Sequence, residues 1–115
     1  MAVSEDFLTS VQELLAFVPE LRARRMFGGA SLYSGDVIFA LLVDDVLYLK
    51  SDEKNAPEFE AAGLEPFIFV NKAGDEAPMP YRRAPDSVWD DEEEARRWAA
   101  LGLDAALRAR AKKSR

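Results

Sequence analysis

The sequence predicts an α+β domain in which an antiparallel sheet of about five strands is covered by an N-terminal helix, a short middle helix and a C-terminal helix. Short apolar segments separated by turn residues run through the first half of the chain, and helical apolar spacing occurs near both ends. The length of 115 residues and the hydrophobic fraction of 49% suit a single domain, residues 1–115, without a second core.

The first helix is predicted to begin after Ser4, a good N-cap, with Glu5 and Asp6 near the positive end of the helix dipole. Because Pro19 disfavours helical geometry at Val18, the helix is expected to end there. Its apolar face is formed by Phe7, Leu8, Val11, Leu14, Leu15 and Val18. Such a helix can dock a partner, but packing on the sheet is the commoner use of an apolar stripe, and we expect packing here.

Residues 21–27 alternate imperfectly between apolar and charged side chains, which is typical of an edge strand or a strongly twisted strand. Gly28 and Gly29 follow, and paired glycines allow either positive φ or a close backbone approach at a bulge or bend. With Arg24 and Arg25 nearby, the glycines would also suit an anion. A phosphate-binding loop, however, would need a lysine–serine ending and a following helix, so the bend is favoured.

A meander of three strands is predicted next, over residues 30–33, 37–43 and 46–50. Turn residues separate these strands, and the two-residue link Asp44-Asp45 fits antiparallel neighbours best. The middle strand is apolar throughout, so we expect it to be central and either covered on both faces or paired with another subunit.

The middle helix is predicted over residues 56–62, with Asn55 as its cap and Gly63 as its end. Residues 66–70 are predicted as a strand and residues 71–78 as a polar loop.

Residues 79–83 are predicted as the last strand, at an edge of the sheet, because Pro80 removes one ladder donor. The C-terminal helix is expected to be capped by Asp90, with Glu93 three residues on. Gly102 would cost about 1 kcal/mol relative to alanine inside this helix, so a close contact is predicted there. The basic residues 108–115 are predicted to be a frayed helix end, with contact to nucleic acid as the alternative.

The chain contains no histidine and no cysteine. This composition removes serine-hydrolase triads, thiolate nucleophiles, disulfides and histidine or cysteine metal sites. Lys50 beside tyrosines would be a base if it were buried, but a surface lysine at a strand end is far commoner. The carboxylate pairs Asp44-Asp45 and Asp52-Glu53 lack the spacing of a calcium loop. We therefore expect no catalytic residue, no cofactor and no metal.

The formal net charge of −6 opposes general attraction to nucleic-acid backbones and anionic membranes, so such binding would need a local basic patch. No apolar stretch is long enough to span a bilayer, and Glu5 and Asp6 stand where a secretory signal would carry positive charge. A cytoplasmic location is expected.

Basic residues from the first and last predicted strands would form a small positive patch with interleaved aromatics if both strands lie on the same side. Such a patch suits an acidic peptide or a phosphate backbone. The alternative is internal pairing with the excess of acids. The candidate interaction surface consists of Arg24, Arg25, Phe27, Gly28, Gly29, Tyr81, Arg82 and Arg83.

The order of several motifs resembles the TfoX N-terminal domain family over nearly the whole chain. The motifs are Arg25-Met26-Phe27-Gly28-Gly29, Leu32-Tyr33, Phe39-Ala40, Leu47-Tyr48-Leu49-Lys50, the helix from Asn55 to Gly63, Pro66-Phe67, Met79, Tyr81, Pro85 and Trp98. The resemblance implies a two-layer α+β domain similar to the secretion chaperones, a bacterial source and frequent dimers. It supplies no catalytic residues.

Two-domain members of this family regulate competence genes together with the cyclic-AMP receptor protein. A second domain of that kind is not expected within the 115 residues, so the promoter role is not expected to carry over directly. The favoured hypothesis is a non-enzymatic regulatory or adaptor module that binds a protein partner. It would act as a homodimer through residues 37–43 or through the small residues Ala95, Gly102 and Ala106 of the last helix.

Two other hypotheses remain open. Arg24, Arg25, Arg82, Arg83 and the basic tail would carry nucleic-acid binding. A small-molecule or enzymatic site would lie around Gly28, Gly29, Tyr48 and Lys50.

Overall fold

The computed structural model describes residues 3–26 and 29–113. Within these ranges the chain forms helices and strands in the predicted α+β order. The helices are α1 (Glu5–Leu14), α2 (Ala56–Ala61), the 3-10 helix η1 (Asp86–Trp89) and α3 (Glu92–Lys113). The strands are β1 (Leu21–Met26), β2 (Gly29–Ser34), β3 (Val37–Val43), β4 (Val46–Lys50), β5 (Pro66–Val70) and β6 (Glu76–Arg83).

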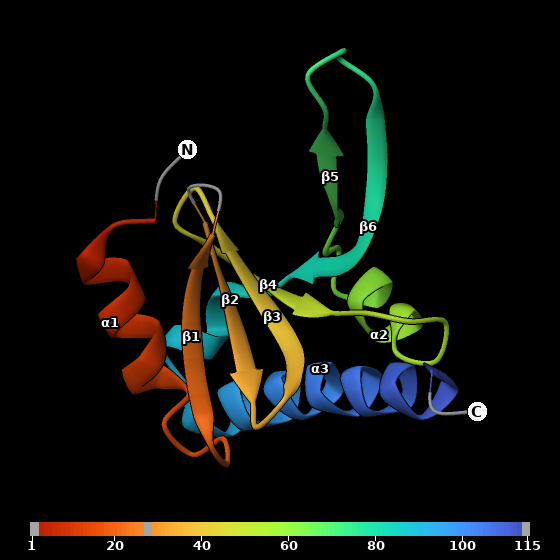
Figure 1. Ribbon diagram of the computed structural model, residues 1–115. Coiled ribbons are helices and arrows are strands. Elements are labelled where there is room, and N and C mark those ends of the chain that lie inside the picture. The colour runs from red at the N-terminus through yellow and green to blue at the C-terminus, as the bar shows by residue number, and fades with distance from the viewer. Residues whose placement is uncertain (1–2, 27–28, 114–115) are drawn as a thin grey trace.

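The described strands form one open antiparallel sheet in the order β1-β2-β3-β4-β6-β5. The α+β fold class is confirmed, with six strands in place of about five. Figure 1 shows α1 and α3 against the body of the sheet, while β5 and β6 project away from it as a hairpin. The predicted meander corresponds to β2, β3 and β4, and the central position of β3 is confirmed.

Burial alternates along the central strands, which defines two faces of the sheet. Leu42, Leu47 and Leu49 are buried in the core that includes Val11 of α1 and Trp98 of α3. We call this side the helix-side face. Side chains of the opposite parity are only half-buried, and we call their side the outer face. By the strand register this face includes Arg22, Arg24, Met26, Ser31, Tyr33, Ile38, Leu41, Val43, Val46, Tyr48, Lys50, Tyr81 and Arg83. Of these residues, Ser31 and Tyr81 are buried.

Helix α1 begins as predicted, because the Ser4 hydroxyl accepts a 3.1 Å hydrogen bond from the Phe7 N–H. The helix ends at Leu14 rather than at Val18, since the Val18 N–H turns back to the Leu15 carbonyl. Val11, Leu15 and Val18 are all buried, so the helix packs on the sheet as expected.

The predicted edge position of the last strand is wrong. The carboxyl half of β6 pairs with β4, and β5 takes the edge. Pro80 is accommodated inside the sheet because its carbonyl still accepts a bond from the Ser51 N–H, while the ladder with β5 is irregular between Pro66 and Ile68. The polar loop is also shorter than predicted, because β6 already begins at Glu76.

Asn55 occupies the capping position of α2, but its side chain makes no capping bond. Its amide group instead donates to the Lys50 and Leu101 carbonyls and accepts from the Asp52 N–H. Asn55 is almost fully buried, and these three bonds satisfy its polar atoms. The predicted cap is therefore a link between β4, α2 and α3.

Helix α3 begins at Glu92, and its first turn is capped by Asp91 rather than Asp90, because the Asp91 carboxylate accepts the Glu93 N–H. The close contact predicted at Gly102 is present, since an added Cβ would lie 3.2 Å from the Phe39 carbonyl oxygen. The helix continues to Lys113, so residues 108–113 are helical where a frayed end was expected. Of the described helices, none combines the length and apolar composition that crossing a membrane requires.

Candidate functional site

The arginines of the candidate surface do not form one patch, because β2, β3 and β4 separate β1 from β6. At the usual strand spacing, β1 and β6 lie about 19 Å apart. The strand register also places the side chains of Arg24 and Arg83 on the outer face. It places those of Arg25 and Arg82 on the helix-side face.

Two of these arginines belong to the helix-side face. The Arg25 guanidinium donates 3.1 Å to the Val3 carbonyl and pairs with the Glu5 carboxylate. The Arg82 guanidinium donates 3.0 Å to the Leu64 carbonyl and 3.2 Å to Glu60 beyond it. Internal pairing, the alternative considered from the sequence, therefore describes these two residues.

The other two arginines are exposed at opposite ends of one row across the outer face. The register places Arg24, Ser31, Leu41, Tyr48 and Arg83 side by side in that order. Between the two positive ends lie the buried Ser31 and the half-buried Leu41 and Tyr48. The outer face is thus an apolar strip with a cation at each end.

Tyr81 lies on the same face but is buried, and burial raises the pKa of its hydroxyl. The Lys50 ammonium lies 4.9 Å from the centre of the Tyr81 ring. A cation over an aromatic face is a stabilising contact, and it gives Lys50 a structural role.

Gly29 opens β2, where its missing side chain matters for packing. An added Cβ would stand 2.6 Å from the Leu42 carbonyl oxygen, far inside contact distance. Of the two explanations for glycine considered from the sequence, close approach applies at Gly29. Phe27 and Gly28 lie outside the described residues.

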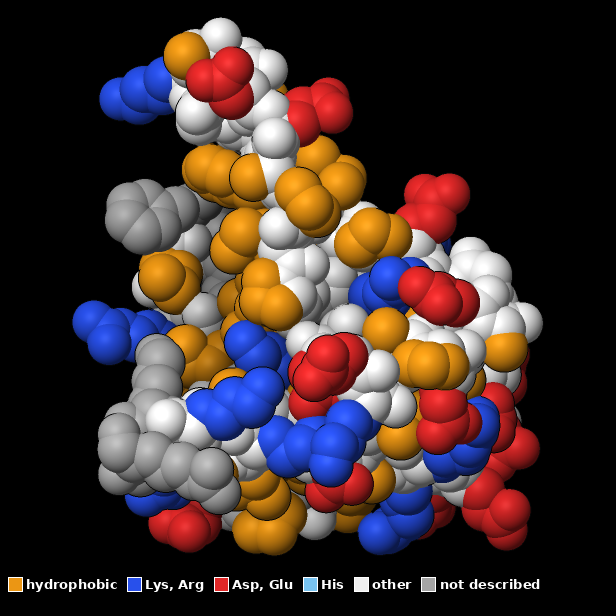
Figure 2. Space-filling model, turned by 90° about the vertical axis from the view of Figure 1, so that its right-hand side faces the viewer, with side chains coloured by type: hydrophobic (Ala, Val, Ile, Leu, Met, Phe, Trp, Pro, Cys, Tyr) orange, Lys and Arg blue, Asp and Glu red, His pale blue; other side chains and the backbone are white. Residues whose placement is uncertain are grey.

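The β5–β6 hairpin carries the apolar surface that sequence reasoning missed. Ile68, Phe69 and Val70 are 41%, 50% and 54% exposed. The Phe67 ring lies 4.9 Å from the Tyr48 ring, so the hairpin continues the outer face. Figure 2 shows hydrophobic side chains along this projection below a charged tip. The sequence predicted a strand at residues 66–70 without assigning its exposure, and its five residues carry no charge.

The hairpin tip is held by a defined set of hydrogen bonds. The Asn71 side-chain oxygen accepts the N–H groups of Ala73 and Asp75, each at 2.9 Å. The backbone closes the turn through Asn71 N–H to the Asp75 carbonyl, and Gly74 supplies the positive φ. The exposed apolar strand is therefore presented by an organised turn.

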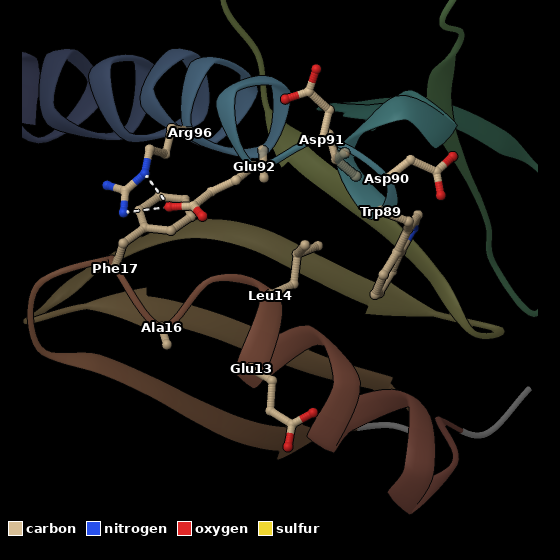
Figure 3. A pocket seen from close by; sticks show the side chains of 11 residues that line it. Glu13, Leu14, Ala16, Phe17, Trp89, Asp90, Asp91, Glu92 and Arg96 are labelled. Carbon is tan, nitrogen blue, oxygen red and sulfur yellow. Dashed lines mark hydrogen bonds and ion pairs between the residues drawn. The ribbon is translucent and has the colours of Figure 1, made fainter.

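A groove of about 410 Å³ lies between α1 and the start of α3. Figure 3 shows Glu13, Asp90 and Asp91 around it, with Trp89 at one end and Phe17 at the other. The guanidinium of Arg96 stacks 4.6 Å from the Phe17 ring and pairs with Glu92. Among the described residues no three carboxylates come together as metal ligands.

A second groove, of about 590 Å³, runs beside the end of α3 and includes Lys50, Lys54 and Lys112. Its centre is the double hydrogen bond between Arg108 and Asp52, at 2.6 and 2.9 Å. The Arg108 hydrogen bond holds the pKa of the Asp52 carboxyl below its ordinary value. The pair anchors α3 to the segment after β4.

The two surfaces first considered for dimerisation differ in their accessibility. Strand β3 is paired on both sides, with β2 and with β4. The small residues Ala95, Gly102 and Ala106 are buried against the sheet. The backbone edges of β3 and the small residues of α3 are therefore not available to a second copy, whereas the half-buried Leu41 and Val43 of β3 lie on the outer face.

Comparison with known proteins identifies the family. Residues 13–106 match the model of the TfoX N-terminal domain. The chain is similar to protein Sxy of Escherichia coli strain K12, at 31% identity over 97 residues that cover 84% of this chain and 46% of Sxy. It is also similar to DNA transformation protein TfoX1 of Aliivibrio fischeri strain ATCC 700601 / ES114, at 34% identity over 70 residues that cover 61% of this chain and 32% of TfoX1.

The chain thus spans less than half the length of these two relatives. The matched residues include α3 up to Ala106 and all six strands of the described sheet. The resemblance seen in the sequence is confirmed, and the chain belongs to the TfoX N-terminal domain family.

Proposed function

We propose that this chain is a non-enzymatic regulatory module that acts through protein–protein contacts made by the outer face of its sheet. One observation carries the proposal: the outer face is an apolar strip that continues into an exposed apolar hairpin. Large apolar surfaces of this kind mark sites of macromolecular contact. The regulatory assignment rests on the family and on the two relatives.

An adaptor role fits the portion of the relatives that the chain covers. One relative is named as a DNA transformation protein, and this chain corresponds to 32% of its length. We propose that the domain recruits a protein partner in a regulatory assembly of the competence type, with the remaining functions supplied by other polypeptide segments.

Nucleic-acid binding is the weaker alternative because the basic residues are dispersed or paired. Arg25, Arg82 and Arg108 each bind a carboxylate within the chain, and Arg24 lies across the sheet from Arg83. Phosphate-backbone binding needs several cations along one surface. The net charge of −6 opposes it further.

The experiment is affinity capture of partners with an outer-face variant and a matched control. Leu41→Glu places a charge in the apolar strip, whereas Leu107→Glu places one on an exposed position of α3. Proteins bound by the unaltered chain should be lost with Leu41→Glu and retained with Leu107→Glu, provided that circular dichroism shows both variants folded.

An identical set of captured proteins from the two variants would contradict the proposal. DNA binding by the purified chain at about 50 mM salt, with the steep salt dependence of phosphate contacts, would favour the alternative.

A further inference from the structure

We propose that the groove beside the end of α3 is a binding site for a small organic phosphate, a phosphate monoester carried on a compact apolar body. The groove is lined by the end of β4, by the turn that follows it and by the carboxyl-terminal part of α3. The inference goes beyond the proposed protein contacts. It rests on the size of the groove, on its charge and on its apolar lining.

The groove is formed by segments that are far apart in the sequence. Ala105, Arg108, Ala109 and Lys112 line it at spacings of three and four residues, which place side chains on one side of a helix. Residues 50–54 and Pro80 complete the lining near them. The volume of about 590 Å³ is in the usual range for small-molecule sites, about 300–1,000 Å³.

The lining of the groove is positively charged, although the protein as a whole is negative. The charged lining residues are four cations and two carboxylates, namely Lys50, Lys54, Arg108 and Lys112 with Asp52 and Glu53. This local excess of two positive charges contrasts with the net charge of −6. Figure 2 views this side of the molecule and shows Lys and Arg side chains gathered below the hydrophobic hairpin. A phosphate monoester, with a charge of about −1.5 to −2 at neutral pH, matches the excess.

Local sequence preferences explain only two of the four cations. The helix dipole favours basic residues near the carboxyl end of a helix, which accounts for Arg108 and Lys112. Lys50 and Lys54 belong to a strand end and a turn, where no such preference applies. Within the part of the chain that the structure describes, no carboxylate pairs with the Lys54 or Lys112 ammonium group. These two exposed lysines therefore remain available to an anion from solution.

The other two cations are held in place by contacts within the domain. The Nε and Nη2 groups of Arg108 donate to Asp52, which takes two of the five N–H donors of the guanidinium. The Lys50 ammonium lies 4.9 Å from the centre of the Tyr81 ring. Groups that are ordered before binding lose less conformational entropy when a ligand arrives. Lys50 and Arg108 thus form the ordered part of the site, and the two exposed lysines form its rim.

Apolar surface lies beside these cations. Pro80, Ala109 and Ala111 line the groove and are exposed or half-buried. Covering them with the carbon atoms of a ligand removes apolar surface from water, which favours binding. An organic phosphate is therefore better suited than inorganic phosphate. A nucleic-acid backbone is less suited, because it needs cations spread along a surface and these cations converge on one groove.

Titration of the unaltered chain with phenyl phosphate, followed by ¹H–¹⁵N NMR at low salt, tests the site. Amide signals of residues 50–54 and 105–112 should shift and saturate, with a dissociation constant of about 1 mM or below. Inorganic phosphate lacks the apolar body and benzyl alcohol lacks the charge. Each should bind about tenfold more weakly, and benzoate, with one negative charge, should also bind more weakly than phenyl phosphate.

A pair of double variants tests the role of the lysines. Lys54→Gln with Lys112→Gln should raise the dissociation constant for phenyl phosphate about tenfold or more, because two charge-assisted hydrogen bonds are lost. Lys72→Gln with Arg24→Gln removes the same number of charges outside the groove and should leave the constant nearly unchanged. All four side chains are exposed, so both variants should fold.

The apolar lining is tested by Ala109→Leu, which fills part of the groove with a larger side chain. Phenyl phosphate should then lose its advantage over inorganic phosphate. Ala100→Leu, at an exposed position of α3 outside the groove, should preserve that advantage.

Three results would overturn the inference. The first is equal affinity for phenyl phosphate and inorganic phosphate, and the second is an equal effect of the two double variants. The third is tighter binding of a single-stranded oligonucleotide with steep salt dependence, which would assign the lysines to nucleic acid. Leu41→Glu should leave phenyl phosphate binding unchanged, so failure of this site and failure of the proposed protein contacts are separate results.

Discussion

The two edge strands of the sheet, β1 and β5, differ in charge and in exposed apolar surface. Strand β1 carries three arginines in six residues, and one of them, Arg25, binds the Val3 carbonyl before α1 and the Glu5 carboxylate in α1. Strand β5 carries no charge and exposes its apolar residues on a hairpin that leaves the body of the domain. Both strands are edges by position, but only β1 is protected against further pairing. The two edges therefore differ in their protection against pairing with another strand.

The largest predicted effect tests the tight packing beside β1. Gly29→Val would drive a side chain into the Leu42 carbonyl oxygen, which lies 2.6 Å from the Cβ position. We expect the free energy of unfolding to fall by about 3 kcal/mol, the size of overpacking in a close-packed core. Chemical denaturation measures the change.

Gly74→Ala at the hairpin tip is the matched control, because nothing lies within 4 Å of its added Cβ and only its positive φ opposes the change. Its effect should be about 1 kcal/mol. Equal losses at Gly29 and Gly74 would mean that the two ends of the sheet are packed alike.

A second prediction concerns the Asp52–Arg108 pair, which lies away from both edge strands. Asp52→Asn weakens the double hydrogen bond to Arg108 and should lower the free energy of unfolding by about 1–2 kcal/mol at neutral pH. Because the folded-state pKa of Asp52 is lowered, this stabilisation is complete above the unfolded pKa near 3.8 and is lost as the pH falls through the folded value.

The difference between the unaltered chain and Asp52→Asn should therefore shrink in acid. Denaturation at several pH values between about 7 and 2 measures it, with Asp75→Asn at the hairpin tip as a control. A constant difference over this range would show that the carboxylate charge is not the cause.

A third prediction concerns the arginine charges that protect the β1 edge. The double variant Arg22→Val with Arg24→Val leaves Arg25 as the one charged residue of β1 and brings its composition closer to that of β5. We expect a change in the free energy of unfolding of at most about 1 kcal/mol, because both side chains are exposed. New self-association should appear in light scattering.

Arg22→Lys with Arg24→Lys keeps the charges and should remain free of this added association. If the valine variant associates no more than the lysine variant, charge is not what distinguishes the two edges.

The smallest stability effect is expected on the hairpin. Val70→Thr keeps the β-branched shape at a position that is 54% exposed, so unfolding should change by about 0.5 kcal/mol or less. Capture of protein partners should weaken, because an exposed apolar side chain of the hairpin becomes polar. A large loss of stability with unchanged capture of partners would place Val70 in the core of the domain instead of on a contact surface.

Local patterns predicted most of the elements of this fold. The turn at Asp44-Asp45, the cap at Ser4 and the contact at Gly102 each depend on a few neighbouring residues and are present in the structure. The cap at Asp90 failed by one residue, because Asp90 and Asp91 are chemically equivalent and the preceding 3-10 helix decides between them.

The candidate surface was harder to predict because it depends on strand order and register. Arg24 and Arg25 are adjacent in the sequence but belong to opposite faces, and β6 inserts between β4 and β5. Pro80 suggested an edge because its missing donor is a local property, whereas the acceptor bond from Ser51 is not. The uncharged β5 has the composition of a buried strand, and only its projection from the body shows that it is exposed.

The buried amide of Asn55 has a consequence for the motions of the domain. It joins the end of β4 to the middle of α3 through the Lys50 and Leu101 carbonyls, so neither segment can loosen without leaving a polar group unsatisfied in a dry interior. Backbone amides on both sides of this link should exchange with deuterium as one cooperative unit, more slowly than those of the projecting hairpin. The β5–β6 hairpin would then open locally, whereas β4 and α3 would open only together.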